Sequence, residues 1–164
     1  MRSFLFIPGD SPRKLEKGLG SGADALLLDL EDSIAPPSKA AARETTVAFL
    51  NEARTAQNRP RLYVRINGLA TGLTDADLDA VVAAAPDGIM FPKAEGGAAV
   101  IHCDAKIAAR EAIAGLPDGG LDIIAIATET AQALFLGVAV GVVGERPGAA
   151  VGIRQGREPL ERDQ

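Results

Sequence analysis

The sequence has few of the residues that build disulfides, metal–sulfur sites or base-stacking surfaces. Its 164 residues include one cysteine, no tryptophan, one tyrosine and five phenylalanines. The single Cys103 excludes an intramolecular disulfide and a cysteine-rich zinc site, and it agrees with a reducing cytoplasm. So few aromatic rings also disfavour a surface that stacks on nucleic-acid bases.

The sequence also lacks a basic run and a long apolar run. Its 17 Lys and Arg stand against 22 Asp and Glu, a net charge of −5. This balance argues against nucleic acid as a partner, because phosphate binding needs clustered cations. A membrane span needs about 18 consecutive apolar residues, and the apolar start at Phe4–Ile7 ends at Pro8. We therefore expect a cytoplasmic globular protein that binds neither nucleic acid nor a membrane.

Five short apolar runs recur along the chain without clean alternation of polar and apolar residues. Continuous runs of this kind are typical of strands that are buried on both faces, as in a parallel sheet. The runs are Phe4–Ile7, Ala23–Leu30, Leu62–Ile66, Gly88–Phe91 and Ile123–Ala127.

Helix-like stretches lie between these runs. Ser11 followed by Pro12 is typical of a helix start, and Thr74 or Asp75 could cap a later helix. The expected helices cover residues 12–19, 38–56, 76–85, 95–113 and about 128–138. Strands that alternate with helices predict an α/β fold with a parallel sheet. Periodicity alone leaves a doubly wound sheet and a (β/α)8 barrel as alternatives.

The composition changes near residue 141. From Gly141 onward, Gly and Arg become frequent and the hydrophobic periodicity disappears. The sequence therefore predicts a domain over residues 1–140 and a divergent, poorly ordered tail over residues 141–164.

Ionisable residues follow every expected strand. Catalytic and ligand-binding residues collect beyond the carboxyl ends of parallel strands. Carboxylates with a few cations indicate Mg²⁺ and an anionic substrate, because Mg²⁺ prefers oxygen ligands. For any one group, a solvated surface charge is the alternative. Along the chain, the ionisable residues are Arg13, Lys14, Asp29, Glu31, Asp32, Arg65, Lys93, Glu95 and Glu129, and the neutral amide Asn67 follows Arg65.

Each of these positions also permits a specific expectation. Strand alternation would place Asp29 and Glu31 on one face and Asp32 on the other. Arg65 lies inside an apolar strand, so a carboxylate from the substrate or from the protein must pair with it. Glu129 could be a metal ligand, or a first-turn acid that the helix dipole favours.

Two other patterns carry little chemistry. His102 and Cys103 are adjacent within an expected helix, so their side chains do not face each other as a nucleophilic pair. Gly137, Gly141 and Gly144 lack the G-x-G-x-x-G spacing of a dinucleotide-binding loop.

Taken together, the strand-end motifs resemble the citrate lyase β-subunit-like family, within the wider group of HpcH/HpaI aldolases and malyl-CoA lyases. Their order and spacing match this family over residues 2 to about 135. The stretches that carry the resemblance are Arg2–Arg13, Gly22–Pro36 with Lys39, Val64–Asn67, Gly88–Glu95 and Ile124–Ala131.

The resemblance implies a (β/α)8 TIM-barrel-type fold that assembles into homo-oligomers such as trimers or hexamers. It also implies a Mg²⁺-dependent lyase that cleaves a carbon–carbon bond in a β-hydroxyacyl thioester, such as a citryl- or malyl-CoA-like substrate. The carrier of the thioester, CoA or an acyl-carrier protein, stays open. Relatives that act on free oxo-acids share the fold, and the Asp-Leu-Glu-Asp stretch favours the citrate-lyase-like branch.

The resemblance also assigns roles to individual residues. The implied metal ligand is Glu129, and the implied catalytic residues are Arg65, Glu31, Asp32 and Lys93. The implied substrate-binding residues are Arg65, Asn67, Arg13 and Lys14, the last two near a CoA phosphate.

The sequence departs from the family pattern in length and in one motif. It contains about five of the eight βα units of a complete barrel. It also lacks the Gly-x-x-Asp-Leu-like motif that supplies a second metal ligand on strand six. We therefore expect a C-terminally truncated or frameshifted barrel whose last strand has an unpaired edge. The alternative function is a catalytically inactive remnant with at most a binding or oligomer-completing role.

Overall fold

The fold is built on one sheet whose strands follow chain order. The computed structural model describes residues 1–131, 133 and 142–143. The parallel strands are β1 (Phe4–Pro8), β2 (Ala25–Asp29), β3 (Arg61–Arg65), β4 (Gly88–Phe91) and β5 (Asp122–Ala125). A short strand, β6 (Val142–Val143), pairs antiparallel with β5. All five expected strands are confirmed, with ends that agree to within two residues.

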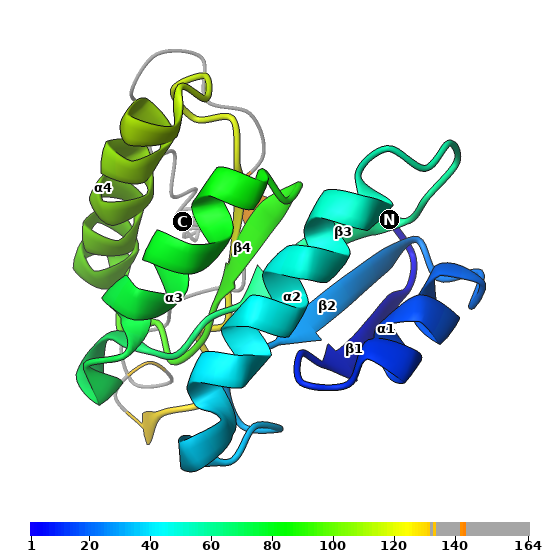
Figure 1. The fold of residues 1–164 in the computed structure, drawn as a ribbon. Helices are drawn as coiled ribbons and strands as arrows, with labels where there is room; N and C mark the ends of the chain where they lie inside the picture. The colour runs from blue at the N-terminus through cyan, green and yellow to red at the C-terminus, as the bar shows by residue number, and fades with distance from the viewer. Residues whose placement is uncertain (132, 134–141, 144–164) are drawn as a thin grey trace, which may run out of the picture.

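Helices connect the strands and lie on one face of the sheet (Figure 1). They are α1 (Pro12–Leu19), α2 (Lys39–Ala53), α3 (Thr74–Val81) and α4 (Gly97–Ala114). Short 3-10 turns occur at η1 (Pro36–Ser38), η2 (Leu69–Thr71) and η3 (Val82–Ala84). The helix expected at residues 76–85 is shorter, because η3 follows α3 and Ala85 then adopts a left-handed backbone with φ of 48°. Most of the helix expected at residues 128–138 lies outside the described residues.

The apolar runs of β2, β3, β4 and β5 are buried on both faces of the sheet. The face toward the helices carries the larger core, which includes Leu26, Leu28, Val64, Ile89 and Phe91. The opposite face carries a second cluster formed by Ala25, Leu27, Tyr63, Met90 and Ile124. Burial on both faces explains why the sequence shows continuous apolar runs rather than alternation.

The two edges of the sheet differ. Within the described part of the chain, β1 has no strand on its outer side, and Phe4, Leu5 and Phe6 are 41%, 38% and 48% exposed. The edge of β5, expected to be unpaired, instead aligns Ile123 and Ile124 with residues 143 and 142 of β6. That expectation was wrong because β6 pairs with β5 along this edge. The rest of the predicted tail, residues 141 and 144–164, lies outside the described residues.

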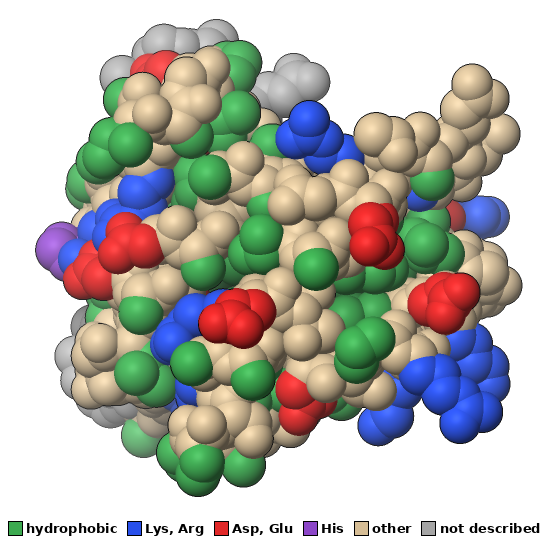
Figure 2. All heavy atoms as spheres, in the orientation of Figure 1, with side chains coloured by type: hydrophobic (Ala, Val, Ile, Leu, Met, Phe, Trp, Pro, Cys, Tyr) green, Lys and Arg blue, Asp and Glu red, His purple; other side chains and the backbone are tan. Residues whose placement is uncertain are grey.

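The helix-covered face is polar and mixed in charge. Figure 2 shows acidic and basic side chains interspersed with apolar ones across this face. Between α3 and α4, Lys106 and Arg110 each form an ion pair with Asp75 at 2.8 and 2.9 Å. Over the described residues, no helix combines the length and apolar character that crossing a membrane requires.

Candidate functional site

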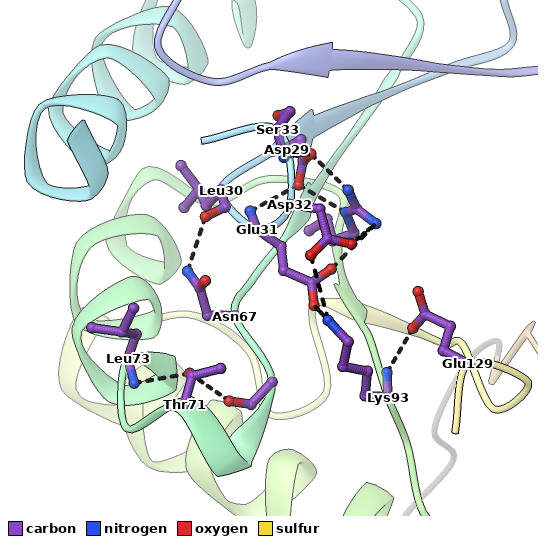
Figure 3. A network of polar contacts seen from close by, with 12 residues as sticks. Asp29, Leu30, Glu31, Asp32, Ser33, Asn67, Thr71, Leu73, Lys93 and Glu129 are labelled. Atoms are coloured by element: carbon purple, nitrogen blue, oxygen red, sulfur yellow. Dashed lines mark hydrogen bonds and ion pairs between the residues drawn. The ribbon is translucent and has the colours of Figure 1, made fainter. Parts of the chain in front are cut away.

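Charged side chains from four neighbouring strands meet at the carboxyl edge of the sheet. Asp29 ends β2, Arg65 ends β3, and Lys93 and Glu129 follow β4 and β5. Parallel strands in register carry their carboxyl ends to the same edge, so residues far apart in sequence become neighbours. Figure 3 shows the side chains of Glu31, Asp32 and Lys93 pointing toward one another, with Glu129 beside them.

The turn after β2 is organised by Asp29. Its carboxylate accepts hydrogen bonds from the N–H of Glu31 at 2.8 Å and from the N–H of Ser33 at 3.1 Å. These bonds curl the chain around Asp29, so the extended strand ends there. Strand alternation therefore does not hold beyond Asp29, and the expectation that Asp32 lies on the opposite face was wrong. Glu31 and Asp32 both face Arg65 and Lys93.

Arg65 is paired mainly with a carboxylate of the protein. Its Nε and Nη2 donate to the two oxygens of Asp29, each at 2.7 Å. Its Nη1 lies 3.2 Å from Glu31 Oε2 and 3.8 Å from Asp32 Oδ2, and the Phe6 ring packs 4.8 Å from the guanidinium carbon. The bidentate edge of the guanidinium is thus occupied by Asp29, and Nη1 is the group that faces the site.

Lys93 contacts three of the acids through two different donors. Its backbone N–H donates to Glu129 Oε2 at 2.8 Å, and its ammonium lies 2.5 Å from Glu31 Oε1 and 3.5 Å from Asp32 Oδ1. Lys93 has a φ of 51°, in the left-handed region that non-glycine residues seldom adopt. Such strain concentrates at functional sites, where the surrounding structure enforces it.

Three carboxylates form a group that fits a small divalent cation. Glu31, Asp32 and Glu129 can each place one oxygen so that the three lie within 4.8 Å of one another. Glu31 Oε2 is buried and accepts no hydrogen bond in the structure, although Arg65 Nη1 is nearby. With Asp29, the carboxylates of this group outnumber Arg65 and Lys93, the two cations that pair with them. An all-oxygen donor set with spare charge suits Mg²⁺.

Burial and pairing shift the pKa values of these groups in different directions. Burial raises the pKa of Glu31 above its usual range, and the opposing effects of Lys93 and Arg65 do not cancel it. Burial would also raise the pKa of Asp29, but hydrogen bonds led by that from Arg65 outweigh it and hold the pKa low. The hydrogen bond to Asp29 raises the pKa of Arg65, and that to Glu31 raises the pKa of Lys93.

The remaining sequence-predicted residues lie apart from this cluster. Both N–H groups of the Asn67 amide and its oxygen have protein partners, namely Leu30, Asp77 and Lys39. Arg13 and Lys14 are exposed on the first turn of α1, and neither forms an ion pair within the described part of the chain.

His102 and Cys103 do not form a reactive pair. His102 is exposed on α4, whereas Cys103 is fully buried, and burial raises the pKa of its thiol to about 12. A thiol in this environment is protonated at neutral pH and is a poor nucleophile.

Two residues of the site region carried no assigned role in the sequence. Lys39 is the first residue of the alanine-rich helix α2, and Asp77 lies in the first turn of α3. In the structure both are buried, and burial lowers the pKa of Lys39. A charged residue on the apolar face of a helix is the pattern that could have indicated them. That pattern can be recognised only when the buried face of the helix is known.

Comparisons with known proteins agree with this arrangement. The family model described as HpcH/HpaI aldolase/citrate lyase matches residues 2–140. A relative named (3S)-malyl-CoA thioesterase, from Cereibacter sphaeroides, is 44% identical over 92 residues, covering 56% of this chain and 32% of the relative. An L-malyl-CoA/beta-methylmalyl-CoA lyase from the same species is 40% identical over 117 residues, covering 70% of this chain and 36% of the relative.

The likeness extends to solved structures. The citrate lyase beta subunit of Mycobacterium tuberculosis, solved with oxaloacetate and magnesium, superposes with a TM-score of 0.59 at 32% identity. The match covers 82% of this chain and 50% of that protein. The expected α/β fold of TIM-barrel type, present as a five-stranded part, is confirmed. The chain spans about a third of the length of the two curated relatives above. The match over residues 2–140 shows that this chain belongs to the HpcH/HpaI aldolase/citrate lyase family.

Proposed function

We propose that this chain acts as a Mg²⁺-dependent carbon–carbon lyase on a β-hydroxyacyl thioester, such as a citryl- or malyl-CoA-like substrate. The observation that carries the proposal is the convergence of Glu31, Asp32 and Glu129 within 4.8 Å, beside Arg65 and Lys93. Relatives named for malyl-CoA chemistry, and a structural relative solved with oxaloacetate and magnesium, support the choice of substrate class and metal.

In this proposal Glu31, Asp32 and Glu129 hold the metal. Bound Mg²⁺ would supply a Lewis acid for the oxygens of the oxo-acid fragment. The N–H of Lys93 orients Glu129 through the bond to Oε2. The turn around Asp29 directs Glu31 and Asp32 toward the same point.

The basic residues would bind the anionic substrate. Asp29 holds the Arg65 guanidinium in place, which leaves Nη1 to donate to a substrate carboxylate. The ammonium of Lys93, half-exposed beside Glu31, is a second charge for the same anion. Arg13 and Lys14, exposed on the helix that follows β1, would contact the phosphates of CoA. The Asn67 amide already bonds to protein groups through both N–H groups and its oxygen, so in this proposal it supports the turn rather than donating to the substrate.

The metal part of the proposal is tested by titration. Mg²⁺ binding to the wild-type chain is measured by calorimetry, and Mn²⁺ binding by electron paramagnetic resonance. Glu129→Gln should weaken binding at least about tenfold, because even an outer-shell partner of a metal ligand is worth that much. Glu95→Gln removes an exposed acid from the neighbouring loop after β4, outside the carboxylate group, and this variant should bind as the wild type does. Equal binding by the Glu129 variant and the wild type would refute the proposed site.

The reaction part is tested by product analysis with malyl-CoA. Cleavage of the carbon–carbon bond yields acetyl-CoA and glyoxylate and leaves the thioester intact. Hydrolysis yields malate and free CoA, whose thiol a thiol reagent detects. Hydrolysis is the second candidate, favoured by the 44% identity with a relative named (3S)-malyl-CoA thioesterase. Metal binding without either product would support the catalytically inactive alternative.

A further inference from the structure

A buried lysine supports the acidic turn from behind. Lys39 is the first residue of α2 and is only 9% exposed. Its ammonium donates to the carbonyl oxygens of Leu30 and Glu31, both at 2.6 Å, and to Asn67 Oδ1 at 2.8 Å. All three donor positions of the ammonium are therefore used.

The acceptors of Lys39 belong to the segment that carries the carboxylates. Leu30 and Glu31 are consecutive residues of the turn between β2 and Asp32. A buried charge is tolerated only when it is well paired and hydrogen-bonded, so the Lys39 ammonium constrains both carbonyls strongly. Because the two carbonyls set the orientation of the peptides around Glu31, they also set where the Glu31 side chain points.

A second set of buried polar groups fixes Lys39 in turn. The Asn67 amide donates to Leu30 O at 2.9 Å and to Asp77 Oδ2 at 2.6 Å, and Asp77 also accepts from Arg43 Nε at 2.7 Å. This chain of contacts joins the ends of β2 and β3 to α2 and α3. No side chain in it belongs to the carboxylate group Glu31, Asp32 and Glu129.

We propose that Lys39 is a positioning residue, which aligns the Glu31 and Asp32 carboxylates for the cation by clamping the Leu30–Glu31 backbone. The identity of the cation rests on the proposed function. The contacts of Lys39 with the Leu30 and Glu31 carbonyls do not depend on any cation. Lys39 touches neither the cation position nor the substrate, so its effect must pass through the turn.

The test compares Lys39→Met with Lys106→Met. Lys106 forms an ion pair with Asp75 on the helical surface and has no contact with the turn. Mn²⁺ affinity, measured by electron paramagnetic resonance, should fall about 10- to 100-fold in Lys39→Met, as expected for loss of a group that orients metal ligands. It should be unchanged in Lys106→Met. Unchanged affinity in a folded Lys39→Met protein would overturn the proposal, even if its melting temperature were lower.

Amide hydrogen exchange measures the effect of Lys39 on the turn in the absence of any metal. The N–H of Glu31 bonds to Asp29 Oδ1, and the N–H of Ile34 bonds to Glu31 O at 3.1 Å, so both amides report the closed turn. In Lys39→Met both should exchange at least tenfold faster, whereas amides within α4 should not change. Equal exchange of the turn amides in wild type and variant would overturn the clamp.

A conservative variant and the wild type complete the experiment. If Lys39→Met does not fold, Lys39→Arg retains the charge and the donors and should lose affinity to a smaller extent. In that case, wild-type affinity together with wild-type turn exchange in Lys39→Arg would overturn the proposal. If the wild type binds no Mn²⁺, the proposed function fails, and the exchange of the turn amides then decides on Lys39 alone.

Discussion

Asp29 is the residue on which the geometry of the site depends most directly. One carboxylate holds Arg65 through two 2.7 Å bonds and shapes the following turn through two backbone N–H groups. Both side chains of this pair are largely buried, with 3% of the Asp29 surface and 12% of the Arg65 surface exposed. Removing one partner of such a pair leaves the other charge buried without compensation, which is more damaging than losing a surface ion pair.

Asp29→Asn should therefore lower stability in a pH-dependent way. The folded-state pKa of Asp29 is lowered, so its contribution is present above the unfolded value of 3.8 and is lost as pH falls through the folded-state pKa. The variant should lose about 3 kcal/mol at neutral pH, and the difference from wild type should shrink below about pH 4. Urea unfolding from neutral pH to below about pH 4 measures the stability difference between variant and wild type, with Asp10→Asn as an exposed control. A difference that does not change with pH would contradict the assignment.

The gathering of Glu31, Asp32, Arg65, Lys93 and Glu129 could be predicted from the sequence. The reason is general, because parallel strands deliver their terminal residues to one edge. The orientation of each side chain could not be predicted. An arginine in an apolar strand must be paired, but the choice of Asp29 over a substrate depends on the turn that Asp29 itself stabilises. Lys39 and Asp77 escaped prediction because their burial is a property of helix packing, which the local sequence does not encode.

At the scale of elements, the strands were easier to predict than the helices. Continuous apolar runs placed all five parallel strands, and in β2 to β5 the run is continuous because residues on both faces of the sheet are buried. Helix ends were less regular, since α3 passes into a 3-10 turn and its N-cap is Leu73 rather than Thr74 or Asp75. The Ser11 start of α1 was located correctly, although its side chain makes no capping hydrogen bond, so Pro12 is the better explanation of that start.

The close contact of β4 with its neighbours depends on Gly88. A Cβ at this position would lie 2.5 Å from the carbonyl oxygen of Asp122 and 2.6 Å from the Tyr63 ring. Gly88→Ala should therefore destabilise the chain by about 1–3 kcal/mol through overpacking. Gly20→Ala is the matched control, because its Cβ would meet only Lys17 O at 3.9 Å and should change stability by less than about 0.5 kcal/mol. Chemical denaturation compares the two, and equal stabilities would show that β4 can shift at little cost.

At the scale of the whole molecule, apolar exposure is concentrated on one edge. Phe4, Leu5 and Phe6 lie together on β1, whose outer side carries no strand within the described residues. By contrast, the exposed residues Ile101 and Ile113, at 54% and 87%, lie several turns apart on α4 and form no continuous patch with each other. An apolar edge strand with free backbone groups is a template for association, whereas a single exposed apolar residue is ordinary.

We therefore expect the chain to self-associate through β1. Phe4→Glu should shift the light-scattering mass toward the 16.9 kDa monomer, because a charge on an edge strand disfavours pairing. Ile113→Glu should leave the mass distribution of the wild type unchanged. Association that persists in Phe4→Glu and disappears in Ile113→Glu would place the contact on the helical surface instead.

The pairing of β6 with β5 makes the two edges of the sheet unequal for the addition of a further strand. A parallel strand added beside β5 would compete for the backbone groups of Ile123 and Ile124 that residues 142–143 already occupy. A strand added beside β1 would displace nothing among the described residues. A strand that extends the sheet toward a closed barrel must therefore displace β6 at the β5 edge, whereas it only has to pair at the β1 edge. The rate of addition at the β5 edge would be limited by how often the antiparallel pair opens.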